Sequence, residues 1–358
     1  RYNSDYQGER LNRIAFPMGG MGAGMICLEG TGALSHFSLR NKPEVFNAPC
    51  VFAAVGIKGL PEAARVLEGP VPGWKLFGTP DSGNGAGGTS YGLPRFAGAT
   101  FRTRFPFAVV NLKDSRIPLQ AEITGWSPFE PGDADNASLP VAALEYRFTN
   151  RSETAVEAVF SFNAKNFMAP GRDDQAVRSI PGGFLLRGSN TKERPWEAGA
   201  FSATVSEPEA KVNAAWFRGG WWDALTVAWN DIANAACFER PDIAEGPPSP
   251  GASLFVPFAV APRESKTITL RLAWFAGKTN QRSGKDPSEN DANVIAASYY
   301  QPWYAGRFGG IEELTSHWRD HYAELREKTR RFSDCFYDST LPPEVVEAVA
   351  ANLTILKS

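Results

Sequence analysis

The chain has 358 residues, 43% of them hydrophobic and 21% charged, so it can bury a large core and does not belong to the disordered class. Its 37 basic and 39 acidic residues leave a formal net charge of -2, which argues against nucleic acid as a partner. Because no run of 18 apolar residues occurs, we expect a soluble protein without a transmembrane segment, in the cytoplasm or exported.

The first notable element is the glycine-rich run Met-Gly-Gly-Met-Gly-Ala-Gly at 18–24. In a dinucleotide-binding site such glycines precede a helix whose amino end faces a pyrophosphate. Here the run is followed by Met-Ile-Cys-Leu and a further Gly-Thr-Gly turn, which is typical of strand and turn. We therefore predict a strand or bulge packed against other backbone, with a loop that reaches a catalytic cleft as the alternative.

Short segments rich in aromatic and β-branched residues follow, separated by glycine, proline and polar turns. A glycine- and proline-rich stretch at 69–98 is predicted to be a long loop. Alternation of apolar and polar residues predicts strands at 141–149, 155–163, 224–229 and 267–275. The polar connector 150–154 indicates that the first two strands form a hairpin, so we expect antiparallel sheets.

The spacing of apolar residues changes from a strand pattern to a helical one towards the carboxyl end of the chain. A polar stretch at 277–291 is expected to end the β core, and 311–332 shows helical spacing with Leu314, Trp318, Tyr322, Leu325 and Thr329 on one face. Pro342 and Pro343 suit a helix start, and the helix they open carries an apolar stripe of Val345, Val349, Leu353 and Leu356.

Two groups of residues are candidates for a sugar pocket or a domain interface. Trp126 is followed by Asp133 and Asp135 in a turn-rich segment, and sugars bind between an aromatic face and carboxylates. The alternative is that Trp126 belongs to the core and Asp133 forms a turn. Arg40 and Asn41 are candidates too, although an arginine that pairs with a carboxylate across a domain interface fits the residues equally well.

The densest aromatic cluster is Trp216, Phe217, Trp221 and Trp222. It would suit a carbohydrate-binding platform, but sandwich cores and domain interfaces need the same bulk. Since adjacent residues of a strand face opposite sides, one surface can use only one of the paired tryptophans. We favour a packing role for this cluster.

No metal site or other cofactor is expected. His317 and His321 share a predicted helix face, but the glutamate of a zinc-protease helix is missing, so packing or surface hydrogen bonding is the favoured role. The cysteines Cys27, Cys50, Cys237 and Cys335 are widely spaced and form no Cys-x-x-Cys pair, which indicates buried free thiols.

Several ordered motifs carry a family resemblance: 18–24, Trp-Ser-Pro-Phe-Glu-Pro-Gly-Asp at 126–133, Ser-Leu-Pro-Val at 138–141, Glu-Tyr-Arg-Phe-Thr-Asn at 145–150, Leu-Ala-Trp-Phe at 272–275, Tyr-Tyr-Gln-Pro-Trp-Tyr at 299–304, and Leu-Pro-Pro and Ala-Asn-Leu near the end. In order and spacing the chain resembles the amino-terminal part of glycoside hydrolase family 116, the β-glucosidase and glucosylceramidase class. The resemblance implies a mainly β chain, with a large antiparallel two-sheet β-sandwich at 1–290. Linker helices would occupy 291–340, and the first helix of a truncated catalytic α/α toroid would occupy 341–358.

The resemblance also implies where the chemistry lies. Family members are retaining enzymes whose Glu nucleophile and Asp acid/base lie in the toroid, with the carboxyl groups roughly 5 Å apart. No segment here matches those catalytic motifs, so we expect no catalytic residue in this chain and place both beyond Ser358. The implied partners are a β-glucoside or glycolipid substrate and the protein's own carboxy-terminal catalytic domain. This half would then support and partly line the sugar pocket.

A second hypothesis belongs to a different class of function. The chain could be a stand-alone carbohydrate-binding or structural β-sandwich module that acts without hydrolysis, through an exposed aromatic face. It predicts that this chain alone binds oligosaccharide, whereas the enzyme hypothesis predicts turnover only when the toroid is present.

Overall fold

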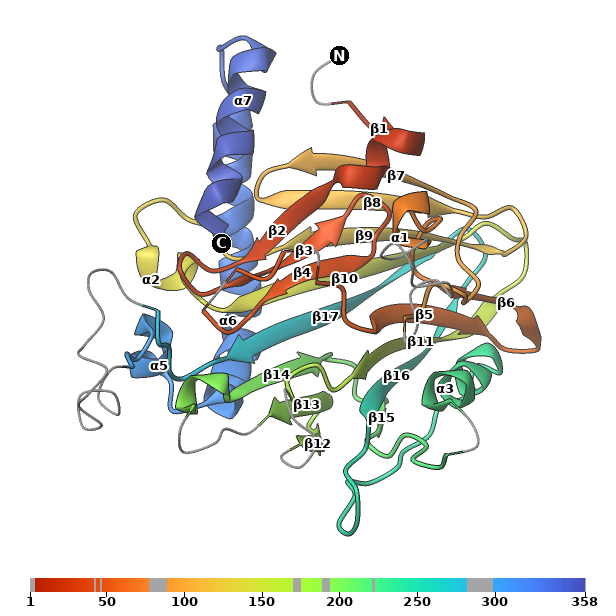
Figure 1. The fold of residues 1–358 in the computed structure, drawn as a ribbon. Coiled ribbons are helices and arrows are strands. Elements are labelled where there is room, and N and C mark those ends of the chain that lie inside the picture. The colour runs from red at the N-terminus through yellow and green to blue at the C-terminus, as the bar shows by residue number, and fades with distance from the viewer. Residues whose placement is uncertain are drawn as a thin grey trace.

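The computed structural model describes residues 4–41, 43–45, 47–76, 89–169, 175–188, 194–220, 223–281 and 299–357. Antiparallel sheets are the most abundant regular structure in this part, and the long helices follow at the carboxyl end (Figure 1). The prediction of a mainly β, antiparallel fold followed by helices is confirmed.

The largest sheet has nine antiparallel strands among the described residues and forms the centre of the molecule. In spatial order they are β1 (Tyr6–Gln7), β7 (Gly98–Arg104), β8 (Phe107–Lys113), β9 (Leu119–Trp126), β10 (Val141–Asn150), β17 (Ser265–Phe275), β14 (Gly199–Thr204), β13 (Gly183–Gly188) and β12 (Gln175–Ile180). The predicted strands at 141–149 and 267–275 are therefore present, and they are neighbours in this sheet.

Two smaller sheets cover one face of the large one (Figure 1). The five-stranded sheet has the order β15 (Lys211–Asn213), β16 (Gly251–Val260), β11 (Val156–Lys165), β5 (Val51–Ile57) and β6 (Leu60–Val66). The three-stranded sheet consists of β2 (Ala15–Gly19), β3 (Met25–Glu29) and β4 (Leu34–Ser38). The expected two-sheet sandwich thus carries a third, small sheet that the sequence did not indicate.

Aromatic side chains fill the space between the large and the five-stranded sheet. The rings of Tyr146 and Phe160 lie 4.9 Å apart, and those of Phe162 and Phe184 stack at 6.2 Å. Each pair joins one sheet to the other, and such contacts add to the hydrophobic gain of burial. The inward residues of both sheets therefore form one continuous core.

The predicted hairpin of 141–149 and 155–163 is wrong. β10 pairs with β9 and β17, whereas β11 pairs with β16 and β5, so the connector crosses from one sheet to the other. Asn150 holds this corner by donating from Nδ2 to the carbonyl oxygens of Thr154 (2.8 Å) and Val260 (2.9 Å). A crossover between facing sheets and a hairpin require the same alternation and a similar short polar connector, so the pattern cannot tell them apart.

Helices cover the remaining surfaces. The α-helices are α1 (Gly73–Leu76), α2 (Ala134–Ala137), α3 (Ala224–Ala233), α5 (Trp303–Arg307), α6 (Ile311–Tyr337) and α7 (Pro343–Leu353), and the 3-10 helices are η1 (Gly8–Arg13), η2 (Pro195–Glu197) and η3 (Thr354–Lys357). Helix α6 begins where predicted but continues past Phe332. Its buried residues Leu314, Trp318 and Leu325 pack on the face of the large sheet that points away from the two smaller sheets.

The segment 224–229 is a helix rather than the predicted strand. The Asp223 carboxylate caps α3 by accepting a hydrogen bond from the Thr226 N–H at 3.0 Å. Leu225, Ala228 and Ile232 then follow at helical spacing and pack on the five-stranded sheet. The valine and tryptophan in this short window resemble a strand, but capping and packing against the sheet decide the outcome.

The apolar stripe of α7 is exposed. Pro342 and Pro343 begin the helix as predicted, but Val345, Val349 and Leu356 are 43%, 45% and 42% exposed, and Leu353 is half-buried. The side of α7 that meets the β-sandwich carries Val346 and Ala350 instead. Of the stripe predicted from spacing, Val345, Val349 and Leu356 are therefore exposed, whereas Leu353 packs against the core.

Candidate functional site

Trp126, at the end of β9, lies in the core between the large sheet and α6. Its indole has 0% exposure and contacts the rings of Trp318 and Tyr322, with centroids 5.5 and 5.4 Å away. The structure thus gives Trp126 the packing position considered as the alternative from sequence. A sugar could stack on this indole only after α6 moved off the sheet.

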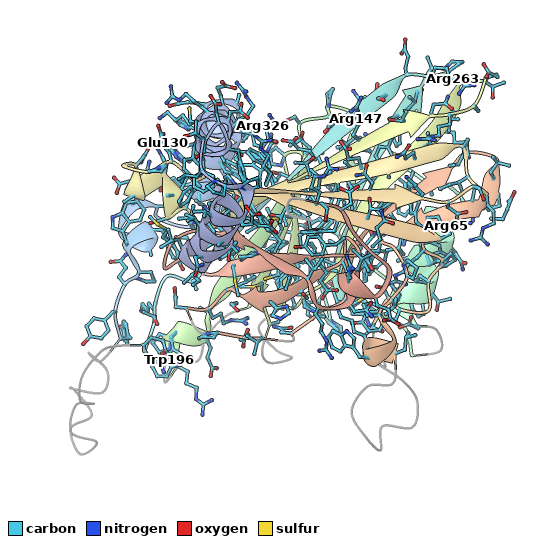
Figure 2. The ribbon with its side chains drawn as sticks, turned by 90° about the horizontal axis from the view of Figure 1, so that it is seen from above. Arg65, Glu130, Arg147, Trp196, Arg263 and Arg326 are labelled. Atoms are coloured by element: carbon cyan, nitrogen blue, oxygen red, sulfur yellow. The ribbon has the colours of Figure 1, made fainter. Side chains whose placement is uncertain are left out.

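A carboxylate that sequence reasoning did not select, Glu145 of β10, gathers several donors beside Trp126. It accepts hydrogen bonds from Trp126 Nε1 at 3.1 Å and from the Tyr322 hydroxyl at 2.6 Å. Arg326 of α6, labelled in Figure 2, binds both Glu145 oxygens in a bidentate pair, at 2.5 and 2.8 Å. This network fastens α6 to the sheet.

The charge state of the network follows from these contacts. Burial would raise the pKa of Glu145, but the hydrogen bonds from Arg326 and Tyr322 outweigh it and hold the pKa below its usual value. Burial, together with the neighbouring carboxylate, raises the pKa of Tyr322. Glu145 is therefore an ionised structural partner with its oxygens occupied, rather than a proton donor.

Asp133 and Asp135 lie outside that cluster. The Asp133 carboxylate caps the short helix α2 by accepting from the Asn136 backbone at 3.1 Å and side chain at 2.7 Å, and Lys328 of α6 lies 4.0 Å away. Although burial opposes it, the pKa of Asp133 is lowered by these contacts. Asp135 is exposed in the same helix. Trp126 and Asp133 both border α6, each through different residues of the helix.

Arg40 and Asn41 lie together just after β4. Arg40 donates to the carbonyl oxygens of Met168 (2.5 Å) and Glu197 (3.2 Å), so its hydrogen-bond partners among the described residues are backbone groups. Burial lowers the pKa of Arg40. Asn41 has a positive φ of 57°, and its Oδ1 accepts a hydrogen bond from the Tyr304 hydroxyl at 3.4 Å.

A cavity of about 500 Å³ lies near these two residues, although neither of them lines it. Gly199 forms part of its wall, and a Cβ built on Gly199 would lie 3.6 Å from Arg40 Nε, so Arg40 backs that wall. Charged residues at the rim are Arg187, which pairs with Glu312, and Lys278, whose Nζ is 3.3 Å from the Tyr299 hydroxyl. The volume lies within the roughly 300–1,000 Å³ of sites for small organic ligands.

Sequence reasoning missed these rim residues because no motif marks them. Arg187 comes from β13, Lys278 follows β17, and Glu312 lies in the first turn of α6. The pairing of β13 with β14, and of β14 with β17, brings the first two segments to one edge, and α6 packs beside them, with Thr315 Oγ1 2.8 Å from Ser202 Oγ of β14.

The glycine-rich run forms the turn between β2 and β3, as expected for strand and turn. A Cβ on Gly20 would lie 2.5 Å from the Leu139 carbonyl oxygen, and one on Gly24 would lie 2.2 Å from that of Ser38. Gly24 also has a positive φ of 84°. The glycines therefore serve close backbone packing, and no helix follows that could hold a pyrophosphate.

Of the remaining candidates, Trp216, His317 and His321 lie in the described part of the chain. Trp216 is buried and donates from Nε1 to Ser253 Oγ at 2.9 Å, while Trp221 and Trp222 lie outside the described residues. The rings of His317 and His321 stack 4.1 Å apart. Across the described ranges, no group of three or more His, Cys, Asp or Glu is arranged to hold a metal ion.

The cysteines differ in exposure. Cys27 and Cys50 are buried free thiols, and burial raises their pKa values to about 12 and about 11. Cys237 is partly buried, while Cys335 on α6 is exposed, against the expectation that the thiols are buried. The long helix carries Cys335 on its solvent side, which the spacing of cysteines alone could not show.

Lys357 of η3 is a buried amine without a carboxylate partner among the contacts of the described residues. Its Nζ donates to the carbonyl oxygens of Gly19 (3.2 Å) and Pro128, and it lies 5.0 Å from the centre of the Phe129 ring. Burial lowers the pKa of Lys357 to about 7. A neutral amine still has two protons for the two carbonyls, so the deprotonated form fits this position.

This position predicts a pH-dependent stability. The folded pKa of Lys357 lies below the unfolded value of 10.5, so between about pH 7 and 10.5 the unfolded chain binds more protons and stability rises with pH. The substitution Lys357→Met should remove this rise of stability with pH. Between pH 7 and pH 9, the free energy of unfolding measured in urea should rise by about 2 kcal/mol more for the natural chain than for this variant.

Lys266→Met, at an exposed position of β17, is the matched control and should leave the pH dependence unchanged. Parallel pH profiles for the natural chain and Lys357→Met would contradict the buried position of this amine.

Comparison with known proteins places the chain in a family. The sequence profile described as "beta-glucosidase 2, glycosyl-hydrolase family 116 N-term" matches residues 15–325. The match defines a glycoside hydrolase domain. More particularly, the chain belongs to glycoside hydrolase family 116, whose N-terminal region this profile describes. No curated protein sequence matches the chain.

Solved structures show distant similarity. A protein assigned as a kojibiose phosphorylase from the human microbiome has 10% identity and a TM-score of 0.35, with 94% of this chain and 32% of that chain covered. A polysaccharide lyase has 11% identity and a TM-score of 0.29, with coverages of 74% and 33%. A family GH92 alpha-mannosidase from Bacteroides thetaiotaomicron has 12% identity and a TM-score of 0.32, with coverages of 94% and 38%. The chain thus spans about a third of the length of these proteins.

Proposed function

We propose that this chain is the non-catalytic β-sandwich half of a retaining β-glycosidase, acting on β-glucosides or on a glycolipid such as glucosylceramide. The observation that carries the proposal is the family 116 match, which extends from β2 into α6 and so includes most of the described sheets. The Glu nucleophile and the Asp acid/base belong, in this proposal, to an α/α toroid domain outside these residues. A retaining mechanism needs those two carboxyl groups roughly 5 Å apart.

The contribution of this half is to support the toroid and to form part of the sugar pocket wall. The cavity beside Arg40 and Asn41 suits that role because it is open, large enough for a sugar, and carries side chains of both charges at its rim. By contrast, the carboxylates nearest Trp126 are engaged: Glu145 by Arg326 and Asp133 by Asn136. A substrate contact therefore fits the Arg40 side of the fold better than the Trp126 side.

The helices of the described part offer no route across a bilayer, since none is both long and apolar enough to span one. The stand-alone binding module stays the alternative function. Its expected aromatic platform finds no support at Trp216, which is buried.

Turnover of an aryl β-glucoside tests the proposal. The protein with its toroid domain should release the aryl group, whereas these 358 residues alone should not. Lys278→Ala in the active protein should raise KM about threefold to tenfold and leave kcat nearly unchanged, because a rim contact binds substrate and transition state alike. Lys266→Ala, which is exposed and away from the cavity, is the control. Turnover by this chain alone would refute the assignment of chemistry to the toroid.

A further inference from the structure

The cavity of about 500 Å³ at the start of α6, beside β13 and β14, is walled mainly by small residues; we call it the α6 cavity. More than half of the residues that line it are glycine or alanine, among them Ala198, Gly309 and Gly310. Apart from its neighbours in the chain, a Cβ built on Gly310 would meet only Glu312 Oε2, at 3.6 Å. Open space therefore adjoins the backbone, and such a wall lets a flat ring approach closely.

Few polar side chains reach the α6 cavity. Among the described residues that line it, those with a charged or hydrogen-bonding side chain are Arg187, Lys278 and Glu312. Arg187 and Glu312 bind each other in an ion pair. Lys278 Nζ lies 3.3 Å from the Tyr299 hydroxyl and 4.5 Å from the centre of the Tyr299 ring. The described lining therefore offers no free carboxylate, carboxamide or hydroxyl side chain.

A glycoside consists of a hydroxyl-rich sugar and an aglycone, and the two parts need different walls. Sugar hydroxyls need side chains that accept and donate hydrogen bonds in fixed directions, such as carboxylates and carboxamides. In the α6 cavity a sugar would give up water without gaining such partners, which is costly for polar groups. An apolar ring loses no hydrogen bond on entry, and it gains from burial against Pro195, Phe275 and Ile311.

The charges of the lining narrow the choice of aglycone. Arg187 and Lys278 are positive and Glu312 is negative, so the described lining is positive as a whole and disfavours a cationic aglycone. Lysine ammonium groups are attracted to the faces of aromatic rings, as the position of Lys278 over Tyr299 illustrates. An uncharged aromatic aglycone therefore suits this lining better than a cationic one.

We propose that the α6 cavity binds the aglycone of the substrate, and that the preferred aglycone is an uncharged aromatic group of up to two fused rings. This inference rests on the proposed glycosidase function and sharpens it, because it assigns the cavity to the aglycone rather than to the sugar. The volume of about 500 Å³ lies within the range of sites that enclose small organic ligands.

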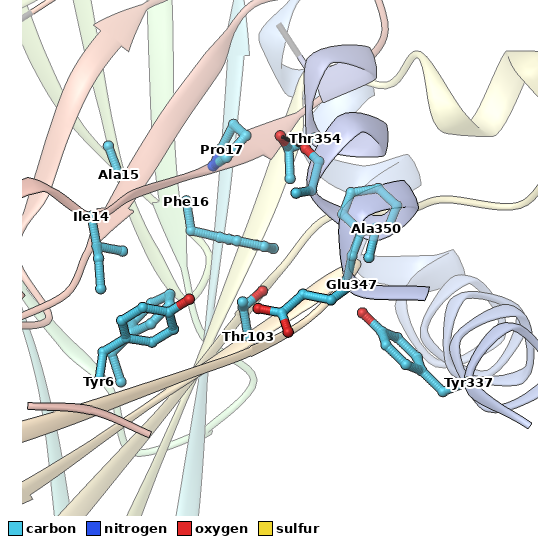
Figure 3. Close-up of a pocket in the computed structure, with 13 residues that line it drawn as sticks. Tyr6, Ile14, Ala15, Phe16, Pro17, Thr103, Tyr337, Glu347, Ala350 and Thr354 are labelled. Atoms are coloured by element: carbon cyan, nitrogen blue, oxygen red, sulfur yellow. Dashed lines mark hydrogen bonds between the residues drawn. The ribbon is translucent and has the colours of Figure 1, made fainter. Parts of the chain in front are cut away.

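A second cavity, of about 250 Å³, provides a comparison within the same chain (Figure 3). We call it the α7 cavity, because it lies between α7 and the strands β1, β2 and β7. Its wall includes the aromatic rings of Phe16, Phe101 and Phe105, so it could also attract an aromatic ring. Its lining shares no residue with that of the α6 cavity. Narrowing each cavity separately therefore shows which one holds the aglycone.

The test compares 2-naphthyl β-glucoside with methyl β-glucoside as substrates of the protein with its toroid domain. The ratio of their kcat/KM values is the aryl preference. Ala198→Leu, which narrows the α6 cavity, should lower the aryl preference about tenfold relative to the natural protein and leave turnover of the methyl glucoside unchanged. Gly310→Val, at an extended backbone position with a φ of 169°, should act in the same way and keeps the test open if Ala198→Leu does not fold. Ala351→Leu, exposed in α7 and part of the α7 cavity, should leave the aryl preference unchanged.

A binding measurement separates this inference from the proposed function. In isothermal titration the 358-residue chain alone should bind 2-naphthol about tenfold more tightly than D-glucose, and Ala198→Leu should weaken 2-naphthol binding about tenfold. If no β-glucoside is turned over, the proposed function fails, whatever the titration shows. If β-glucosides are turned over, the aglycone site alone is overturned by an aryl preference that Ala198→Leu and Gly310→Val both preserve, by a loss that Ala351→Leu causes instead, by glucose as the tighter ligand, or by no saturable naphthol binding.

Discussion

Replacing Glu145→Ala is expected to destabilise the chain by about 3 kcal/mol, the largest loss that we expect from one polar side chain. The change leaves Arg326 without its partner and the Trp126 indole N–H and the Tyr322 hydroxyl without their acceptor. Removing one member of a buried charged pair typically costs about 3–5 kcal/mol. The lower end applies because the Arg326 side chain is 36% exposed and can regain water. Urea unfolding at pH 7 measures the effect.

Glu327→Ala is the matched control for this variant. Glu327 lies on the same helix and pairs with Arg330 at 2.7 Å, but both side chains are exposed, so the loss should be within about 1 kcal/mol. Arg326→Met combined with Glu145→Gln should cost less than the sum of the single changes, since the two residues share one interaction. Similar losses for Glu145→Ala and Glu327→Ala would show that the network does not fasten α6.

Gly24→Ala is expected to cost about 3 kcal/mol or more. The new Cβ would lie 2.2 Å from the Ser38 carbonyl oxygen, and the residue would also have to hold a φ of +84°. Positive φ alone costs roughly 1–2 kcal/mol for an alanine, and forcing atoms into packed space adds about 1–3 kcal/mol. Since the obstacle is backbone, it cannot rotate away. The free energy of unfolding in guanidinium chloride gives the loss.

The same turn provides the control. Gly22 also has a positive φ, +65°, but a Cβ there would meet nothing within 4 Å. Gly22→Ala should therefore lose only about 1 kcal/mol, the backbone contribution. The difference between the two losses of unfolding free energy measures the cost of the close approach of the turn to β4. Equal losses would contradict that close approach.

Elements with long, regular patterns could be predicted from the sequence. The alternation at 267–275 and the helical face of Leu314, Trp318 and Leu325 both appear as expected, because burial of one face is a local property that spacing records. The segment 224–229 was mistaken because six residues are too few for the period to decide. Its capping residue, Asp223, was a signal that could have corrected the prediction.

Features that depend on distant residues could not be predicted. Glu145 and Arg326 are 181 positions apart, and nothing near either residue indicates the pairing. The crossover between β10 and β11 carries the same local pattern as a hairpin, so only the partners in each sheet distinguish them. The family resemblance came from ordered motifs and was confirmed, whereas the roles of Arg40, Asn41, Trp126, Asp133 and Asp135 in sugar recognition stay predictions.

The position of β17 in the large sheet constrains how the chain can fold. This strand lies between β10 and β14 and pairs with both, for example through Leu272 with Ala142 and with Ala203. Until residues 265–275 leave the ribosome, the sheet consists of two separate parts, each with an open edge that could pair wrongly. Because β17 lies far along the chain from its partner β10, the two strands can pair only by closing a long loop, and this makes folding slow. Synthesis that stops before β17 should therefore yield aggregation rather than a smaller stable domain.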